Sequence, residues 1–152
     1  MPSFGLNDDH EPHGAAAPAW PGPFAQALGL FALEWQDDRA RVALELGERH
    51  LNLRGTAHGG VVATIMAAAT RLACRRAAGP TELGTIVPVS ASVLYLAGHP
   101  SGRLVCEASL CGGGRSVFMT QAVLWSGSRR LATGHATYRL DAPAHRPRSE
   151  AP

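Results

Sequence analysis

His58, Gly59 and Gly60 stand directly before a run of side chains that is almost entirely apolar, residues 61–74. The first amides of a helix lack intrahelical acceptors, and with the positive end of the helix dipole they attract an anion or a carbonyl oxygen that gains negative charge. A helix that begins at these glycines is therefore a candidate oxyanion site. On spacing alone, a glycine-rich helix start beside a partly buried histidine is the stronger interpretation.

Chemistry on a carbonyl group at such a site commonly needs a general base or a nucleophile, and this part of the chain has no carboxylate. No Asp or Glu occurs between Glu48 and Glu82. Thr64 and Thr70 have no base beside them in the sequence that would make their hydroxyls nucleophilic. Cys74 also lacks a His or carboxylate at a recognisable spacing, so we expect an inert thiol there.

The apolar run predicts a helix over residues 59–78 that has no polar face. Such a helix must be buried on nearly all sides. Its basic residues gather near its end, where Arg71, Arg75 and Arg76 suit the negative end of the helix dipole.

Strand patterns on both sides of this helix predict the sheet that covers it. A short helix at 23–30 comes first, followed by a hairpin of residues 30–36 and 39–46, in which apolar residues alternate with others. Glycine-containing turns then separate four extended segments, at about 85–96, 103–111, 115–126 and 130–140. An antiparallel sheet curled around the single long helix satisfies burial most simply, which predicts an α+β fold.

The composition of the chain predicts one globular domain. The 152 residues are 45% hydrophobic and 17% charged, and the net charge of +2 comes with scattered arginines, which argues against nucleic-acid binding. No apolar run reaches the length of a membrane span, and residues 1–14 do not resemble a secretion signal, so we expect a cytoplasmic protein that does not bind membranes. We expect a domain at 20–140 between flexible tails at 1–19 and 141–152.

The potential metal ligands give no convincing site in the sequence. Cys74, Cys106 and Cys111 have no C-x-x-C spacing, and we expect three reduced, buried thiols. A group of acidic and histidine side chains lies in the N-terminal tail, where a solvated segment is the preferred interpretation: Asp8, Asp9, His10, Glu11 and His13. We therefore expect no metal ion.

Several segments together resemble the hotdog-fold acyl-CoA thioesterases of the phenylacetate-pathway (PaaI-like) group. They include "PFAQALGL", "HLNLRGTAHGG" and "GRLVCEASLCGGGRSVFMTQAVLW", and the resemblance runs from about residue 22 to 140. The most specific residues are Asn52, Gly55, His58, Gly59 and Gly60 in that spacing. The resemblance implies an antiparallel sheet of about five to six strands wrapped around one long central helix. It also implies a homodimer or tetramer with active sites at the dimer interface, acyl-CoA as substrate and no cofactor, because CoA is part of the substrate.

The resemblance also implies roles for residues at the start of the helix. The amide of Gly60, or of its neighbour Gly59, would hold the thioester carbonyl oxygen. Asn52 and His58 would orient the loop and the substrate or water around that carbonyl.

Further candidates for substrate binding lie in two other segments. "GGGRS" matches a turn that lies near bound CoA in relatives, which makes Gly114, Arg115 and Ser116 candidates, with Arg115 for the phosphates; an exposed arginine that binds nothing is almost equally consistent. Ser90 and Ser92 occupy alternate positions of one strand, where they either help to hold water or face solvent.

Two departures from the family pattern concern activity. The catalytic Asp or Glu of the family lies nine residues after the motif histidine, and here that position is Ala67. Relatives often have a basic residue and Pro after the strand tyrosine, whereas Tyr95 is followed by Leu96, Ala97 and Gly98. The sequence therefore supports a thioester hydrolase with an altered base, and alternatively a hotdog protein that binds acyl-CoA without turnover. Nothing favours a third chemistry, the hydration or dehydration of an enoyl thioester.

Overall fold

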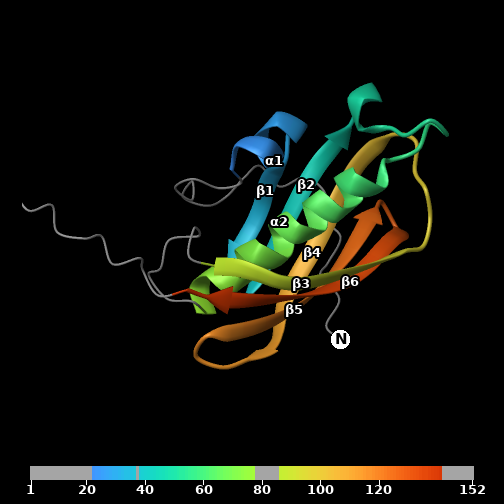
Figure 1. The fold of residues 1–152 in the computed structure, drawn as a ribbon. Helices are drawn as coiled ribbons and strands as arrows, with labels where there is room; N and C mark the ends of the chain where they lie inside the picture. The colour runs from blue at the N-terminus through green and yellow to red at the C-terminus, as the bar shows by residue number, and fades with distance from the viewer. Residues whose placement is uncertain (1–21, 37, 78–85, 142–152) are drawn as a thin grey trace, which may run out of the picture.

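A computed structural model describes residues 22–36, 38–77 and 86–141 as one sheet and one long helix (Figure 1). The elements follow the order α1 (Pro23–Leu28), β1 (Phe31–Gln36), β2 (Arg39–Leu46), a 3-10 turn at Glu48–His50, α2 (Gly59–Ala77), β3 (Ile86–Tyr95), β4 (Gly102–Gly113), β5 (Val117–Ser126) and β6 (Arg129–Leu140). Each predicted helix and strand is present within a few residues of its expected bounds. The two predicted tails, the acidic and histidine group in the first of them, and Glu82 lie outside the described residues.

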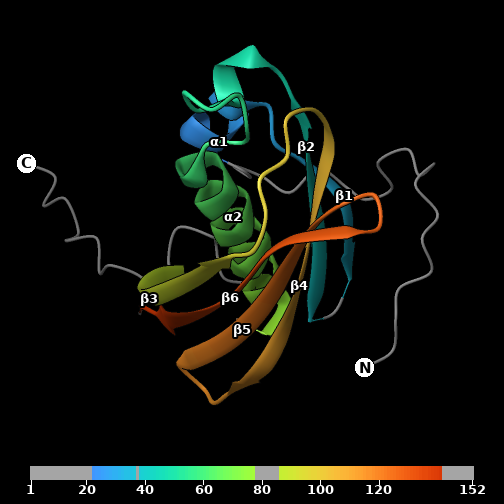
Figure 2. The ribbon, with the colours of Figure 1, turned by 90° about the vertical axis from the view of Figure 1, so that its right-hand side faces the viewer.

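The six strands form one antiparallel sheet in the order β1-β2-β4-β5-β6-β3. β3 follows α2 in the chain and pairs with β6, so β3 lies at one edge of the sheet and β1 at the other. Figure 2 shows the sheet curving around α2. The predicted α+β architecture, an antiparallel sheet wrapped around one central helix, is confirmed.

The main core lies between α2 and the inner face of the sheet. Ile65 and Leu72 of α2 are fully buried in one cluster with Leu44, Leu104 and Leu124 from three strands. Burial of each such side chain contributes about 1.5–3 kcal/mol, so this layer supplies most of the driving force for folding.

The prediction that α2 is buried on nearly all sides is wrong for the single chain. Gly60 and Ala67 are exposed, and Ala63, Thr64 and Ala68 are half-buried. The physical reason is that the sheet of one chain wraps only part of the helix circumference. A strip of small residues therefore remains open along α2.

The predicted alternation in β2 holds on its inner face and is wrong on its outer face. Arg41 and Ala43 point away from α2 yet are buried. Ala43 packs with Leu33 and Val105 in a small outer cluster, and the Arg41 guanidinium lies 3.4 Å from the Glu107 carboxylate. Residues on both faces of β2 are thus buried.

Two of the three cysteines are buried as predicted, and the third is not. Cys74 and Cys106 are inaccessible, whereas Cys111 is exposed beside a register irregularity near the end of β4. The irregularity lies between Leu110 and Gly112, where the regular alternation of inward and outward side chains is lost. Burial raises the pKa of the Cys74 thiol to about 12, so Cys74 is not an activated nucleophile.

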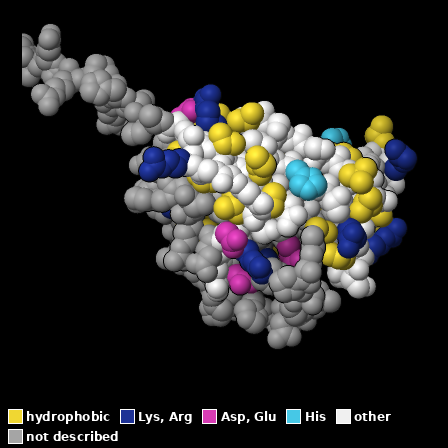
Figure 3. Space-filling model, turned by 90° about the horizontal axis from the view of Figure 1, so that it is seen from below, with side chains coloured by type: hydrophobic (Ala, Val, Ile, Leu, Met, Phe, Trp, Pro, Cys, Tyr) yellow, Lys and Arg dark blue, Asp and Glu magenta, His cyan; other side chains and the backbone are white. Residues whose placement is uncertain are grey.

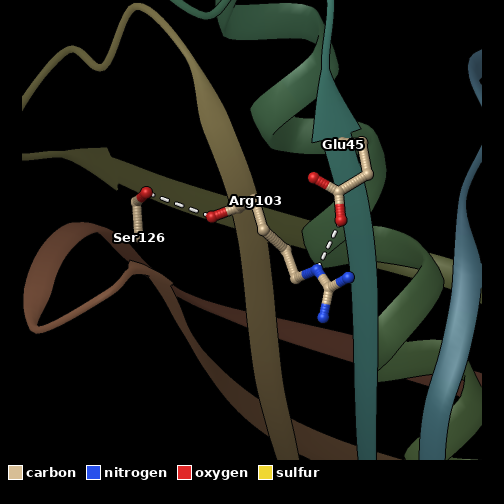
Figure 4. A network of polar contacts seen from close by, with 3 residues as sticks. All are labelled: Glu45, Arg103 and Ser126. Carbon is tan, nitrogen blue, oxygen red and sulfur yellow. Dashed lines mark hydrogen bonds and ion pairs between the residues drawn. The ribbon is translucent and has the colours of Figure 1, made fainter. Parts of the chain in front are cut away.

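A polar network ties three strands together at one end of the sheet (Figure 4). The Arg103 guanidinium on β4 donates to the Glu45 carboxylate on β2, and the Ser126 hydroxyl on β5 donates to the Arg103 carbonyl at 3.0 Å. Both charged side chains are substantially exposed, so solvent screens the pair and its contribution to stability is small.

Gly134 marks the closest approach between β6, β3 and α2. A Cβ atom at this position would collide with the Ser92 carbonyl oxygen and lie 2.9 Å from the Met66 methyl group. We therefore expect Gly134→Ala to lower the free energy of unfolding by ~1–3 kcal/mol, as overpacking of a core does. Chemical denaturation at fixed protein concentration measures the change.

Gly114→Ala is the matched control, because a Cβ at Gly114 would meet no atom within 4 Å. Equal stability of Gly134→Ala and the parent protein would show that the strands separate more easily than this packing indicates.

Candidate active site at the start of the long helix

Asn52 organises the loop that leads into α2. Its side-chain oxygen accepts hydrogen bonds from the backbone N–H groups of Arg54 (2.9 Å) and Thr56 (3.3 Å), and its amide nitrogen donates to the Thr56 hydroxyl at 3.1 Å. Gly55 adopts a left-handed conformation with φ 68°, which a residue with a side chain rarely adopts. Asn52 thus holds the loop through both its side-chain oxygen and its amide nitrogen.

Two histidines join the loop to the rest of the molecule. The His58 N–H donates to the His50 carbonyl at 2.8 Å. The buried His50 ring accepts from the Gly47 N–H at Nδ1 (2.9 Å), and its Nε2 lies 2.9 Å from the Leu28 carbonyl oxygen and 3.1 Å from Arg49 Nε. His50 therefore connects the loop to the end of α1.

The first amides of α2 differ in whether they have an acceptor. The His58 carbonyl accepts from Val61 (2.9 Å) and Val62 (3.1 Å), and His58 Nδ1 accepts from the Gly60 N–H at 3.0 Å. Within the described part of the chain, the Gly59 N–H has no acceptor. Of the two predicted amides, Gly59 is therefore the one available to a carbonyl oxygen.

The same contact determines which nitrogen of His58 carries the proton. Because Nδ1 accepts a hydrogen bond, we assign the proton of the neutral ring to Nε2. The ring is exposed, so Nε2–H is a second donor beside the helix start.

Tyr95, at the end of β3, lies against Gly59. Its hydroxyl donates to the Gly59 carbonyl at 3.2 Å, and its side chain is 55% exposed. The sequence indicated Tyr95 only as the strand tyrosine after which the family pattern changes, because no local pattern shows which strand end meets the helix.

Two open hollows flank the loop. The first, of about 490 Å³, is lined by Leu51, Asn52, Leu53, Arg54 and His58. The second, of about 520 Å³, reaches the start of α2 and the end of β3, and its lining is Asn52, Arg54, Thr56, Ala57, Gly59, Val62, Tyr95, Leu96, Ala97, Gly98 and Leu131. No Asp or Glu is among the described residues that line either hollow.

Position 67 has no group that replaces the missing carboxylate. Ala67 is exposed, and its carbonyl accepts from the Tyr138 hydroxyl (3.1 Å) and the Thr70 hydroxyl (3.2 Å). Burial raises the pKa of Tyr138, so its phenol stays protonated and acts as a donor. The Thr64 hydroxyl donates to the Gly60 carbonyl at 2.7 Å and, among the described residues, has no base beside it.

The nearest described carboxylate after the helix in sequence does not reach the site. Glu107 lies on β4 and pairs with Arg41 on the outer face of the sheet, at 3.4 Å. Its neighbours Cys106 and Ala108 are the residues of this stretch that face the core.

The structure does not bring the two predicted serines to the helix start within one chain. Ser90 and Ser92 lie directly opposite Thr137 and His135 of β6. Opposed residues share a face of the sheet, and this face is opposite to that of Tyr138, which contacts α2. Ser90 and Ser92 therefore lie on the outer face. Figure 3 views the molecule from below, where hydrophobic side chains (yellow) lie among other side chains and backbone (white) over much of the described surface.

The hairpin that carries Gly114, Arg115 and Ser116 lies at the other end of the molecule. In Figure 1 the β4–β5 turn lies near the end of α2, whereas Gly59 begins the helix at its opposite end. All three residues are exposed. Within one chain, Asn52, His58, Gly59 and Gly60 come together and the hairpin stays apart from them.

Two further features of the described residues concern metals and membranes. Within these ranges, no three His, Cys, Asp or Glu side chains group in a way that would hold a metal ion. None of the described helices is both long and apolar enough to span a membrane.

Comparison with known proteins places this arrangement in a family. Residues 54–133, which include most of the loop, all of α2 and β3 to β5, match the family model described as the thioesterase superfamily. The chain belongs to the thioesterase superfamily. A comparison of this chain with curated protein sequences found none that is significantly similar to it.

Solved structures agree with this membership and with a PaaI-like hotdog fold. A protein of Thermus thermophilus is 30% identical with a TM-score of 0.71, covering 78% of this chain and 97% of its own. A mutant of the phenylacetic acid degradation protein PaaI from the same organism is 29% identical, with a TM-score of 0.71 and coverages of 78% and 99%. A conserved protein of Pseudomonas aeruginosa has a TM-score of 0.76 at 22% identity, with coverages of 84% and 100%, and supports the fold alone.

A substitution at Gly59 separates a role in ligand binding from a role in folding. A Cβ at Gly59 would lie 3.6 Å from the Tyr95 ring, which is an ordinary contact distance. The Gly59→Ala variant should therefore fold normally. The added methyl group beside the free amide should hinder a ligand carbonyl, and we expect acyl-CoA binding to weaken by up to about tenfold, as the loss of one hydrogen bond between neutral groups does. Thermal unfolding and a binding titration measure the two effects.

Gly60→Ala is the comparison, since its Cβ would lie 3.1 Å from His58 Nδ1 and displace that ring. Unchanged binding in Gly59→Ala would exclude the Gly59 amide from the site.

Proposed function

We propose that this protein hydrolyses an acyl-CoA or aryl-CoA thioester to the free acid and CoA. The observation that supports the proposal most is the unengaged Gly59 amide at the positive end of α2, between His58 and Tyr95. In this mechanism the amide stabilises the negative charge that develops on the thioester oxygen. A water oxygen bonds to the carbonyl carbon, the C–S bond breaks, and the sulfur leaves with a proton as the CoA thiol.

We propose that the active protein is a homodimer, or a tetramer of two such dimers, formed through the edge strand β3. One side of β3 has no neighbouring strand among the described residues, and Val89, Leu94 and Tyr95 expose 61%, 62% and 55% of their surface. An unprotected edge with apolar side chains favours pairing with another strand. Two β3 strands paired antiparallel would continue the sheet across both subunits.

This pairing would complete the site with residues of the second subunit. β3 begins beside the end of α2, where Ile86 packs with Cys74, and it ends at Tyr95 beside the start of α2. A two-fold axis through β3 therefore brings the far end of one subunit to the helix start of the other. That far end includes the hairpin of Arg115. Its Ser116 carbonyl accepts a hydrogen bond from the Leu140 N–H, and Leu140 pairs with Ile86 at the start of β3.

Position 67 favours a second candidate function, the binding of acyl-CoA without turnover. The absence of a general base costs ~10²–10⁴ in rate, and no described carboxylate lines the hollows at the helix start. Hydrolysis over a panel of acyl and aryl CoAs, measured beside binding, separates the two functions. Binding with no turnover would select the second.

Restoring the carboxylate tests whether only the base has been lost. Ala67 is exposed in the single chain, so Ala67→Asp places its side chain at the surface of α2 and not in the core. We expect hydrolysis of a bound acyl-CoA to rise tenfold or more, given the ~10²–10⁴ that a general base contributes. Steady-state hydrolysis assays measure the rate.

Ala67→Asn is the control for a polar side chain that cannot act as a base. A folded Ala67→Asp protein that binds ligand yet hydrolyses no faster than Ala67→Asn would show that more than the acid has changed.

Association through β3 makes a separate prediction. We expect an oligomer at micromolar concentration by light scattering, because a monomer would leave the apolar edge in water. A monodisperse monomer would contradict both the dimer and the shared site.

A further inference from the structure

We propose that Arg54 is a specificity-determining residue that binds a phosphate on the carrier arm of the thioester substrate. This inference rests on the proposed function and adds to it the group that distinguishes a phosphorylated carrier from an unphosphorylated one. Arg54 was not among the residues that the sequence or the family resemblance indicated.

Arg54 lies at the junction of the two hollows beside the helix start. Arg54 and Asn52 are the two residues that line both hollows, which reach His58 on one side and Gly59 with Tyr95 on the other. Among the described residues that line them, Arg54 is the one Lys, Arg, Asp or Glu. Within one chain, a ligand that occupies either hollow therefore meets this one guanidinium.

The backbone holds Arg54 in a defined place although its side chain is exposed. Its N–H donates to the Asn52 side-chain oxygen at 2.9 Å, and the left-handed Gly55 follows it. The Asn52 contacts that shape the helix start therefore also position the base of the Arg54 side chain. Among the described residues, no acidic side chain forms an ion pair with Arg54, so its charge is available to a ligand.

The surroundings of Arg54 suit the end of a pantetheine arm. Leu51, Leu53 and Leu96 contribute apolar lining to the hollows, and the arm itself is uncharged between its thioester and its phosphate. A guanidinium matches a phosphate with two parallel hydrogen bonds, and a partly apolar setting strengthens them. Arg54 lies in the loop before the helix and lines the same hollow as Gly59.

The phosphate has two possible sources, the one next to the pantetheine arm and those of the CoA nucleotide. Ligands that contain successively larger parts of acyl-CoA distinguish these sources. Non-hydrolysable thioether analogues of acyl-pantetheine, acyl-4′-phosphopantetheine and acyl-CoA carry no phosphate, one phosphate, and the full set with the nucleotide. Calorimetric titration of the intact protein with each analogue gives binding constants that do not depend on turnover. The proteins compared are the parent, Arg54→Gln and Arg54→Lys.

We expect Arg54→Gln to weaken binding of the phosphorylated analogues about tenfold or more, as the loss of hydrogen bonds to a charged group does. Binding of the pantetheine analogue should change less than about twofold, and Arg54→Lys should restore part of the loss because it keeps the charge. Equal losses for phosphopantetheine and CoA would assign the contact to the phosphate next to the arm, which carrier proteins share. A loss for CoA alone would assign it to the nucleotide phosphates.

Arg39→Gln is the matched control, since it removes the same charge at the β1–β2 turn, where Arg39 lies 3.8 Å from Asp38. Equal weakening of all three analogues in Arg54→Gln, or no weakening, would overturn the proposal. If binding depends on Arg54 but the protein hydrolyses no thioester, the role of Arg54 would stand and the proposed hydrolysis would be rejected. A parent protein that binds none of the analogues would overturn both.

Discussion

Enclosure of α2 is the constraint on which the rest of the structure depends. The helix has almost no polar side chains along Val61–Cys74, so water must be excluded from most of its surface. The sheet meets this demand by curving, and the curvature requires close approaches such as that at Gly134. The burial that holds the fold together also fixes where the helix begins, which is the point at which we propose that the substrate binds.

The start of α2 shows how a few hydrogen bonds select one amide from several equivalent ones. Asn52 shapes the loop, His50 ties it to α1, and His58 occupies the amide of Gly60. Among the described residues, the Gly59 N–H alone of these two amides has no acceptor. The candidate site is thus defined by which donors the protein uses itself, and Arg54 is the one Lys, Arg, Asp or Glu among the described residues that line it.

The sequence predicted the elements well because periodicity and turn residues act locally. The bounds of α2 and of all six strands followed from such patterns within a few residues. The grouping of Asn52 with His58 and Gly59 came instead from the resemblance to PaaI-like thioesterases. The face of the sheet on which Ser90 and Ser92 lie could not be predicted from local patterns, because it depends on the pairing of β3 with β6. The contact of Tyr95 with Gly59 and the proposed role of Arg54 could not be predicted either, since they depend on how a strand end and a loop tip meet the helix start in three dimensions.

The edge strand β3 also restricts how this protein can associate. Pro88 lacks an N–H, and the register of β3 against β6 shifts between Pro88 and Ser90, so the regular part of the strand runs from Ser90 to Tyr95. A strand with so short a regular part would accept one antiparallel partner of the same length and would offer a poor template for further growth. β3 is an open edge with exposed apolar side chains. Pro88 and the register shift beside it would therefore act against the addition of further chains to this edge and against fibre formation.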